Sequence, residues 1–109
     1  MTAAERALDA LGDEHRRAIL LHLSGGSCSV QQIADALPIS RPAVSRHLRL
    51  LSEAGLVTHR AEGTRNIYDL REDGVAAVAD YFRSVWGDAM ARFALLTENT
   101  APVAEPADE

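Results

Sequence analysis

Apolar side chains recur every three to four positions over the first 37 residues, which is the spacing of amphipathic helices. The pattern predicts three helices, at residues 3–11, 14–23 and 30–37. Asp13 and Ser29 stand directly before the second and third of them, where a short polar side chain caps a helix. Pro38 closes the third helix, because its ring cannot continue the hydrogen-bond ladder.

A fourth helix is predicted over residues 41–54, only three residues after the third one. Ser40 is a favoured N-cap, Pro42 falls in the first turn, and Gly55 provides the left-handed residue that ends many helices. One side of this helix is apolar and carries Val44, Leu48 and Leu51. Two short helices joined by a tight turn, the second of them amphipathic, form the helix-turn-helix pattern.

Two β-prone runs follow directly, and together they predict a hairpin over residues 57–70. Gly63 lies between them and permits the positive φ of a tight turn, which places Arg60 and Arg65 near the tip. A helix-turn-helix followed by a hairpin is a winged helix. We therefore predict a mainly α fold with a small β-hairpin, an α+β winged helix-turn-helix of order α-α-α-α-β-β-α.

The last predicted helix, residues 74–96, has an unusually wide apolar surface. One apolar strip of this helix consists of Val75, Val78, Phe82, Val85 and Ala89. Trp86, Met90 and Phe93 form a second apolar strip beside it. They could line an effector pocket or pack against another subunit, and aromatic stripes at helical spacing are more often packing surfaces. Residues 1–96 are expected to form one domain, and residues 97–109 a disordered acidic tail, because they are rich in proline, alanine and acids.

Charge is segregated along the chain. The net charge of all 109 residues is −5, but residues 40–71 carry six arginines against three acids, a local charge of +3. Residues 1–39 carry −2 and residues 72–109 carry −6. A basic middle third between acidic flanks predicts a local surface for a polyanion, although a solvated charged face would show the same composition.

Composition also excludes several classes of protein. No run of about eighteen apolar residues exists, and the first residues lack the basic start and apolar run of a signal peptide, so we expect a cytoplasmic protein without a membrane partner. A lone cysteine, Cys28, cannot form a disulfide within the chain. No phosphate-binding loop, carboxylate pair or catalytic triad is evident, which argues against an enzyme.

The chain resembles the ArsR/SmtB winged-helix transcriptional regulators. The resemblance covers roughly residues 7–93 and rests on "LGDEHRRAILLHL", "SVQQIADALPISRPAVSRHLRLLSEAGLV", "RAEGTRNIYDL" and the last helix. It implies a homodimer built from helices 3–11 and 74–96, which binds an imperfect inverted repeat, usually as a repressor, and is released by a small effector, often a metal ion. We place the dimer interface at Leu8, Leu11, Val78, Phe82, Val85, Trp86, Met90 and Phe93.

The predicted partner is double-stranded DNA, an operator read by the helix 41–54 in the major groove and by the wing 57–70 on the adjacent minor groove. Arg46 can read guanine edges, and Arg49 should meet phosphate. His47 lies on the flank, where packing and a backbone hydrogen bond are expected. The predicted DNA-binding residues are Ser40, Arg41, Pro42, Ala43, Ser45, Arg46, Arg49, Arg60, Arg65 and Asn66.

Sensing is where this chain departs from the family. Metal-binding members carry a Cys-x-Cys pair where this sequence has Ser29, Val30 and Gln31, and residues 74–96 contain no histidine or cysteine. We therefore expect no metal and no cofactor, and the effector is unknown. A buried, inert thiol is the favoured role for Cys28; metal or redox sensing through Cys28, or a winged helix used only for protein contact, remain the alternatives.

Overall fold

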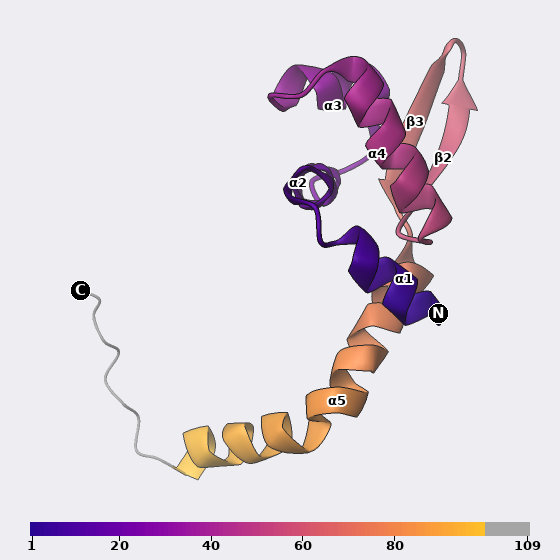
Figure 1. Cartoon of the computed structure of the whole chain (residues 1–109). Helices are drawn as coiled ribbons and strands as arrows, with labels where there is room; N and C mark the ends of the chain where they lie inside the picture. Colours follow the sequence, from indigo (N-terminus) through magenta and orange to yellow (C-terminus); the bar gives the residue numbers. More distant parts are fainter. Residues whose placement is uncertain (100–109) are drawn as a thin grey trace, which may run out of the picture. The chain divides into compact units, whose positions relative to one another are not determined.

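The computed structural model describes residues 1–99, apart from the side chains of Met90 and Asn99. The chain divides into two compact units, and the boundary between them follows Ala79. The elements are α1 (Ala3–Ala10), α2 (Glu14–Leu23), β1 (Cys28–Ser29), α3 (Val30–Ala36), α4 (Arg41–Glu53), β2 (Val57–Glu62), β3 (Arg65–Leu70) and α5 (Glu72–Asn99). In the first unit, α3, the start of α4 and the tip of the β2–β3 hairpin lie at the same end (Figure 1).

The helix starts follow the predicted caps. The Asp13 side chain accepts hydrogen bonds from the first turn of α2, and the Ser40 hydroxyl accepts one from the N–H of Ala43. At α3 the cap is reciprocal, because the Ser29 hydroxyl accepts from the N–H of Gln32 while the Gln32 side chain accepts from the N–H of Ser29. Such capping boxes satisfy amide groups that a helix cannot pair internally, and so they fix where each helix begins.

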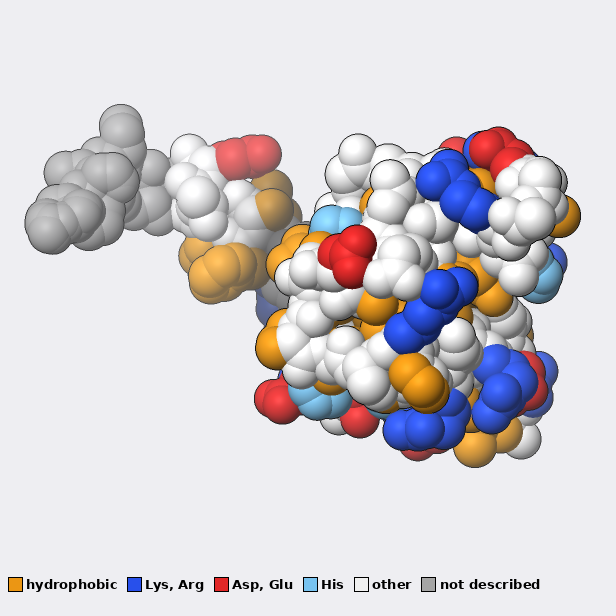
Figure 2. All heavy atoms as spheres, turned by 90° about the horizontal axis from the view of Figure 1, so that it is seen from above, with side chains coloured by type: hydrophobic (Ala, Val, Ile, Leu, Met, Phe, Trp, Pro, Cys, Tyr) orange, Lys and Arg blue, Asp and Glu red, His pale blue; other side chains and the backbone are white. Residues whose placement is uncertain are grey.

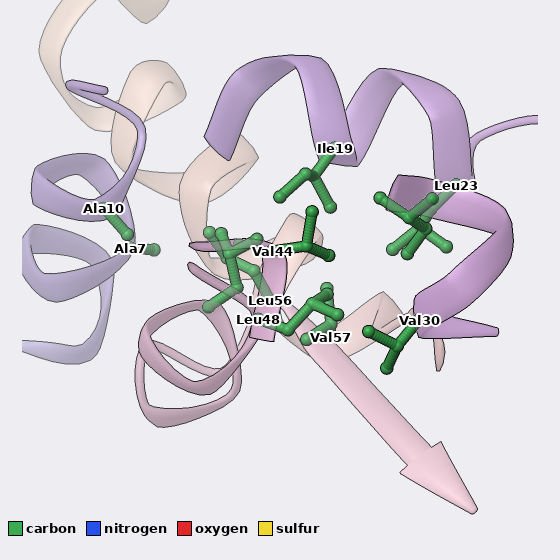
Figure 3. Packing of buried hydrophobic residues seen from close by; sticks show 11 residues of the cluster. Ala7, Ala10, Ile19, Leu23, Val30, Val44, Leu48, Leu56 and Val57 are labelled. Carbon is green, nitrogen blue, oxygen red and sulfur yellow. The ribbon is translucent and has the colours of Figure 1, made fainter. Parts of the chain in front are cut away.

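A single apolar core holds the helix-turn-helix together. Ile19 and Leu23 of α2 point toward Val44 and Leu48 of α4 (Figure 3), and all four side chains are essentially fully buried. Leu56 and Val57 close the core where the chain enters the hairpin. The predicted apolar face of α4 is confirmed, since Val44, Leu48 and Leu51 have no exposed surface within the chain.

The predicted hairpin is confirmed, and a third strand extends it. Strands β2 and β3 pair antiparallel from Val57 opposite Leu70 to Glu62 opposite Arg65, and Gly63 in the turn has a φ of 64°. The short strand β1 pairs with the other edge of β3, so the strand order is β1-β3-β2. This strand was not predicted, because two residues are too few to show any periodicity.

A close backbone approach attaches the start of α5 to the rest of the first unit. A Cβ atom at Gly74 would overlap the carbonyl oxygen of Gly55, so only glycine allows this contact. The N–H of Arg71 also donates to the carbonyl of Leu56 at 2.9 Å. The close packing therefore connects the end of the hairpin with the turn that follows α4.

Helix α5 is longer than predicted. It begins two residues earlier, at Glu72, and continues through Asn99, so residues 97–99 are helical and the expected disordered tail is wrong for them. Residues 100–109 of that tail lie outside the described residues. The second unit contains residues 80–99 of this helix, and its apolar side chains stand exposed, with Trp86 at 47% and Phe93 at 72%.

Candidate nucleic-acid interface

The two sides of α4 have opposite chemistry. Its apolar side is buried in the core, and this burial fixes how the helix is rotated about its axis. Arg41, Arg46 and Arg49 all lie on exposed positions of the same helix. Among residues 1–99, no acidic side chain forms an ion pair with Arg46 or Arg49, so both charges are available to an external partner.

The first turn of α4 offers small polar and apolar groups. Ser45 and Pro42 are exposed, and Ala43 is half-buried. The hydroxyl oxygen of Ser40 accepts the capping hydrogen bond from Ala43 at 3.3 Å. Because a hydroxyl both donates and accepts, the Ser40 O–H can still donate to another group.

The wing contributes a second set of cations. Arg65 and Asn66 are exposed at the start of β3, directly after the turn. Arg60 is also exposed, but its guanidinium forms an ion pair with Glu62 at 3.0 Å. That pair is solvent-exposed and therefore weak, so it does not prevent Arg60 from exchanging partners. The sequence pattern did not reveal that Glu62 would compete with a ligand for the guanidinium of Arg60.

Helix α4, which is the predicted recognition helix, and the wing line one groove. This groove has a volume of about 260 Å³ and lies between the start of α4 and the hairpin turn. A different cavity, of about 400 Å³, lies between α1 and the end of α4. The residues that line the groove are Ser29, Val30, Gln31, Arg41, Thr64, Arg65 and Asn66. The structure thus brings together three of the predicted DNA-binding residues, and it adds Gln31 and Thr64, which the sequence reading did not assign to the site.

Arginine side chains are spread over the end of the first unit that carries α3, α4 and the hairpin tip. The space-filling view shows them at several points of this face, with white and orange atoms between them (Figure 2). Acidic side chains are also visible in this view, but residues 40–71 carry a local charge of +3. Such a distribution suits a phosphate backbone, which is contacted along its length rather than at one point.

His47 occupies the boundary between the buried and exposed sides of α4. It is 8% exposed, and its ring centroid lies 5.8 Å from that of His15. The predicted packing is confirmed, but the expected hydrogen bond is wrong, because Nδ1 is buried without a partner among the described residues. Burial lowers the pKa of His47, opposed by the nearby carboxylate of Asp13, so the neutral imidazole is favoured.

Cys28 is partly exposed and not buried as expected. It lies on β1, at the edge of the sheet, and its thiol donates to the carbonyl of Gly26 at 3.5 Å. Strand pairing holds Cys28 opposite Tyr68, which keeps the side chain near the surface. Within residues 1–99, no group of three or more histidine, cysteine or acidic side chains is placed to hold a metal ion.

The predicted dimer residues fall into two groups. Leu8, Leu11 and Val78 are half-buried within the first unit, where the latter two pack against the core. The second group lies on α5 and is exposed: Phe82, Val85, Trp86 and Phe93. The side chain of the eighth residue, Met90, lies outside the described part of the chain. Among the described helices, none has the length and apolar character needed to cross a membrane.

Known proteins agree with this geometry. A family model described as a helix-turn-helix domain matches residues 11–60. The HTH-type transcriptional regulator Rv2034 of Mycobacterium tuberculosis is 42% identical over 95 residues, which are 87% of this chain and 89% of that protein. A crystal structure of a possible transcriptional regulator for arsenical resistance superposes with a TM-score of 0.69 at 37% identity, covering 86% of this chain and 96% of that one.

A second solved structure adds the assembly state of a relative. It is the solution structure of the homodimeric winged helix-turn-helix DNA-binding domain of Mb0332 from Mycobacterium bovis, a possible ArsR-family transcriptional regulator. The TM-score is 0.63 at 34% identity, with 84% of this chain and 82% of that one covered. Fold, surface and relatives agree: the chain belongs to the ArsR/SmtB family of winged helix-turn-helix, DNA-binding transcriptional regulators.

Proposed function

We propose that the chain is a homodimeric repressor that binds an inverted repeat in double-stranded DNA. The N-terminal half of α4 enters the major groove, and the wing lies on the adjacent minor groove. The observation that carries this proposal is the orientation of α4. Burial of Val44, Leu48 and Leu51 leaves Arg46 and Arg49 on exposed positions without acidic partners among residues 1–99.

Base reading and positioning are divided among the exposed residues. Arg46 reads a guanine edge, because a guanidinium can donate to O6 and N7 together. Ser45 serves a neighbouring base edge, Ala43 contacts a thymine methyl group, and Arg49 binds backbone phosphate one turn later. Arg60, Arg65 and Asn66 contact the minor groove or its phosphates. A neutral or acidic exposed side would instead favour a winged helix used only for protein contact.

The proposed dimer brings two copies of α4 to the same side of one duplex. Exposed Phe82, Val85, Trp86 and Phe93 supply the apolar surface on α5 that supports it. Phe82 and Trp86 are stacked with ring centroids 5.2 Å apart, so they offer one broad aromatic surface rather than two isolated rings. The homodimeric relative from Mycobacterium bovis supports the same assembly for this chain.

We propose no enzymatic activity, no bound metal and a cytoplasmic location. Repression is the activity most consistent with the family. The operator sequence, once known, would identify the regulated genes. Cys28 is not given a sensing role in this proposal. Its partial exposure makes oxidation the alternative that an experiment should include.

Selection of bound duplexes from a random DNA pool tests the proposal. We expect the full chain to enrich an imperfect inverted repeat whose half-sites lie about one helical turn, roughly 10 base pairs, apart. The selection is repeated with zinc, with copper and with an oxidant, and the enriched sequences and their yield should not change. Loss of enrichment under oxidation would instead assign a sensing role to Cys28.

A matched pair of variants controls for charge. Arg46→Ala/Arg49→Ala removes two arginines from α4, whereas Arg83→Ala/Arg92→Ala removes two exposed arginines from the second unit. Only the first variant should lose enrichment. Failure of the unmodified chain to enrich any sequence, or equal loss in both variants, would contradict DNA reading by α4.

A further inference from the structure

A side-chain network links the start of α3 to the start of α4. The guanidinium of Arg41 donates from Nη1 to the amide oxygen of Gln31 at 2.7 Å. The amide nitrogen of Gln31 in turn donates to the carboxylate of Asp35 at 2.7 Å, one turn further along α3. Asp35 thereby fixes which end of the Gln31 amide faces Arg41.

The neutral amide holds Arg41 without neutralising it. A carboxylate in the place of Gln31 would add a negative charge that competes with an anion for the guanidinium, but the amide adds no charge and uses only one of the five N–H donors. The remaining donors and the full positive charge stay available. Arg41 is therefore a cation held in one orientation and still able to bind an anion.

This orientation directs Arg41 toward the groove shared with the wing. The groove has a volume of about 260 Å³ and is also lined by Thr64, Arg65 and Asn66. Every polar side chain among these can donate a hydrogen bond, and no acidic side chain lines the groove. Two guanidinium groups, a hydroxyl and an amide around one small concavity match the chemistry of a phosphate.

We propose that this groove binds one phosphodiester of the DNA backbone, and that Gln31 is the positioning residue that holds Arg41 for it. The inference rests on the proposed function and deepens it, because it joins the recognition helix and the wing through a single phosphate. Arg41 then fixes the register of α4 on the duplex and does not read a base.

Salt dependence of binding separates a phosphate contact from a base contact. Fluorescence anisotropy of the full chain with a selected duplex and with an unrelated duplex is measured over a range of salt concentrations. Arg41→Ala should weaken binding to both duplexes by the same factor, roughly five- to tenfold. It should also lower the log–log salt slope by about 1.8, because the dimer loses one phosphate contact of about 0.9 in each of its two half-sites. Loss confined to the selected duplex would overturn the assignment.

A double-mutant cycle tests the role of Gln31. Gln31→Ala should weaken binding to both duplexes by roughly two- to threefold, because Arg41 must then be ordered on binding, with the salt slope unchanged. In the Arg41→Ala background the same change should have no effect. A purely structural role would lower the melting temperature and would persist in that background, so an unchanged cost of Gln31→Ala there would overturn the proposal.

Gln31→Glu gives a second, independent variant. The new carboxylate adds a negative charge beside the bound phosphate and competes with it for Arg41, so both the affinity and the salt slope should fall. Arg83→Ala, which removes a charge from the second unit, is the matched control and should leave the slope as it is. A Gln31→Glu chain that keeps the full slope and full affinity would contradict the positioning role.

A free phosphate could present the same chemistry, and a titration without DNA distinguishes the two. The Nε–Hε resonance of Arg41 should shift on addition of duplex and not with inorganic phosphate at the same phosphate concentration. An equal shift with inorganic phosphate would replace the DNA site by a small-anion site. If the unmodified chain binds no duplex, the proposed function itself fails; if it binds and the variants match it, only this inference fails.

Discussion

Helix α4 and the second half of α5 use similar residues in opposite ways. In α4 the aliphatic side chains of Val44, Leu48 and Leu51 are buried in the core, and Arg41, Arg46 and Arg49 occupy exposed positions. In residues 80–99 of α5 the large apolar side chains are themselves exposed, among them Trp86 and Phe93. The first helix is complete within one chain and presents charge, whereas the second presents an apolar surface of the kind that another subunit covers.

The comparison separates what one chain does alone from what requires a second copy. Rotation of α4 about its axis is fixed by its own core, so the DNA-reading surface should exist in a monomer. Spacing between two such surfaces should depend on α5. Changes in the two helices should therefore affect different measurements.

The largest effect is expected from the buried side of α4. Leu48→Ala should lower the free energy of unfolding by about 2 to 5 kcal/mol, because it removes a fully buried side chain and leaves a cavity. Leu50→Ala on the same helix is the control, since Leu50 is 38% exposed. Its cost should stay below about 1 kcal/mol. Urea denaturation at one fixed protein concentration measures both, and equal costs would mean that α4 is not rotated as described.

The exposed aromatic surface of α5 comes next. Trp86→Ala should weaken self-association by about 2 to 4 kcal/mol, the range of an interface anchor, and weaken operator binding with it. Sedimentation equilibrium measures the association. Leu21→Ala is the control, because Leu21 is 76% exposed on α2 and lies outside the proposed interface. A Trp86→Ala chain that remains dimeric would remove Trp86 from the interface.

Arg46→Ala tests the exposed side of α4. It should cost about 1 to 3 kcal/mol of binding and relax the preference at one base pair in each half-site. Self-association should not change, which distinguishes this variant from Trp86→Ala. Binding to a panel of single-base variants of the operator measures the preference. Uniform loss over the whole panel would make Arg46 a phosphate contact.

A smaller effect is expected from His47. Its ordinary pKa is 6.5, and burial lowers the pKa in the folded chain, opposed by Asp13, while Arg16, His15 and Arg46 act in the same direction as burial. The unfolded chain therefore takes up a proton at a higher pH than the folded one. The free energy of unfolding should fall as the pH drops below about 6.5 and level off below the folded pKa.

His47→Leu should flatten this part of the pH profile. Leu50→Ala provides the control, because it keeps all four histidines and should leave the slope of the profile as in the unmodified chain. Denaturation series between about pH 7.5 and about pH 5.5 measure the slope. A profile that is equally steep without His47 would show that another group accounts for it.

Much of the fold could be predicted from the sequence because the signals are local. Helical periodicity predicted that Val44, Leu48 and Leu51 form one buried face. Short polar side chains directly before two helices predicted Ser29 and Ser40 as caps. Each of these depends on residues only a few positions apart. The ends of α5 were predicted wrongly, because Asp73, Thr97 and Asn99 have low helix propensity and yet belong to the helix.

The features that were missed depend on contacts between distant segments. Strand β1 exists because β3 offers a free edge, about forty positions away, for Cys28 and Ser29. Gln31 meets Arg41 only through the angle between α3 and α4, and a hydrogen bond between them leaves no mark in the periodicity. The unpaired Nδ1 of His47 likewise results from packing against α2.

The central claim is that an acidic chain binds DNA through its basic middle third. Its most direct test is the affinity of the unmodified chain for the selected operator as a function of salt concentration. We expect a steep decrease, with a log–log slope of about 0.9 for each phosphate neutralised by an arginine. Affinity that does not change with salt would contradict it, because the exposed arginines of α4 and the wing would then contribute nothing to binding.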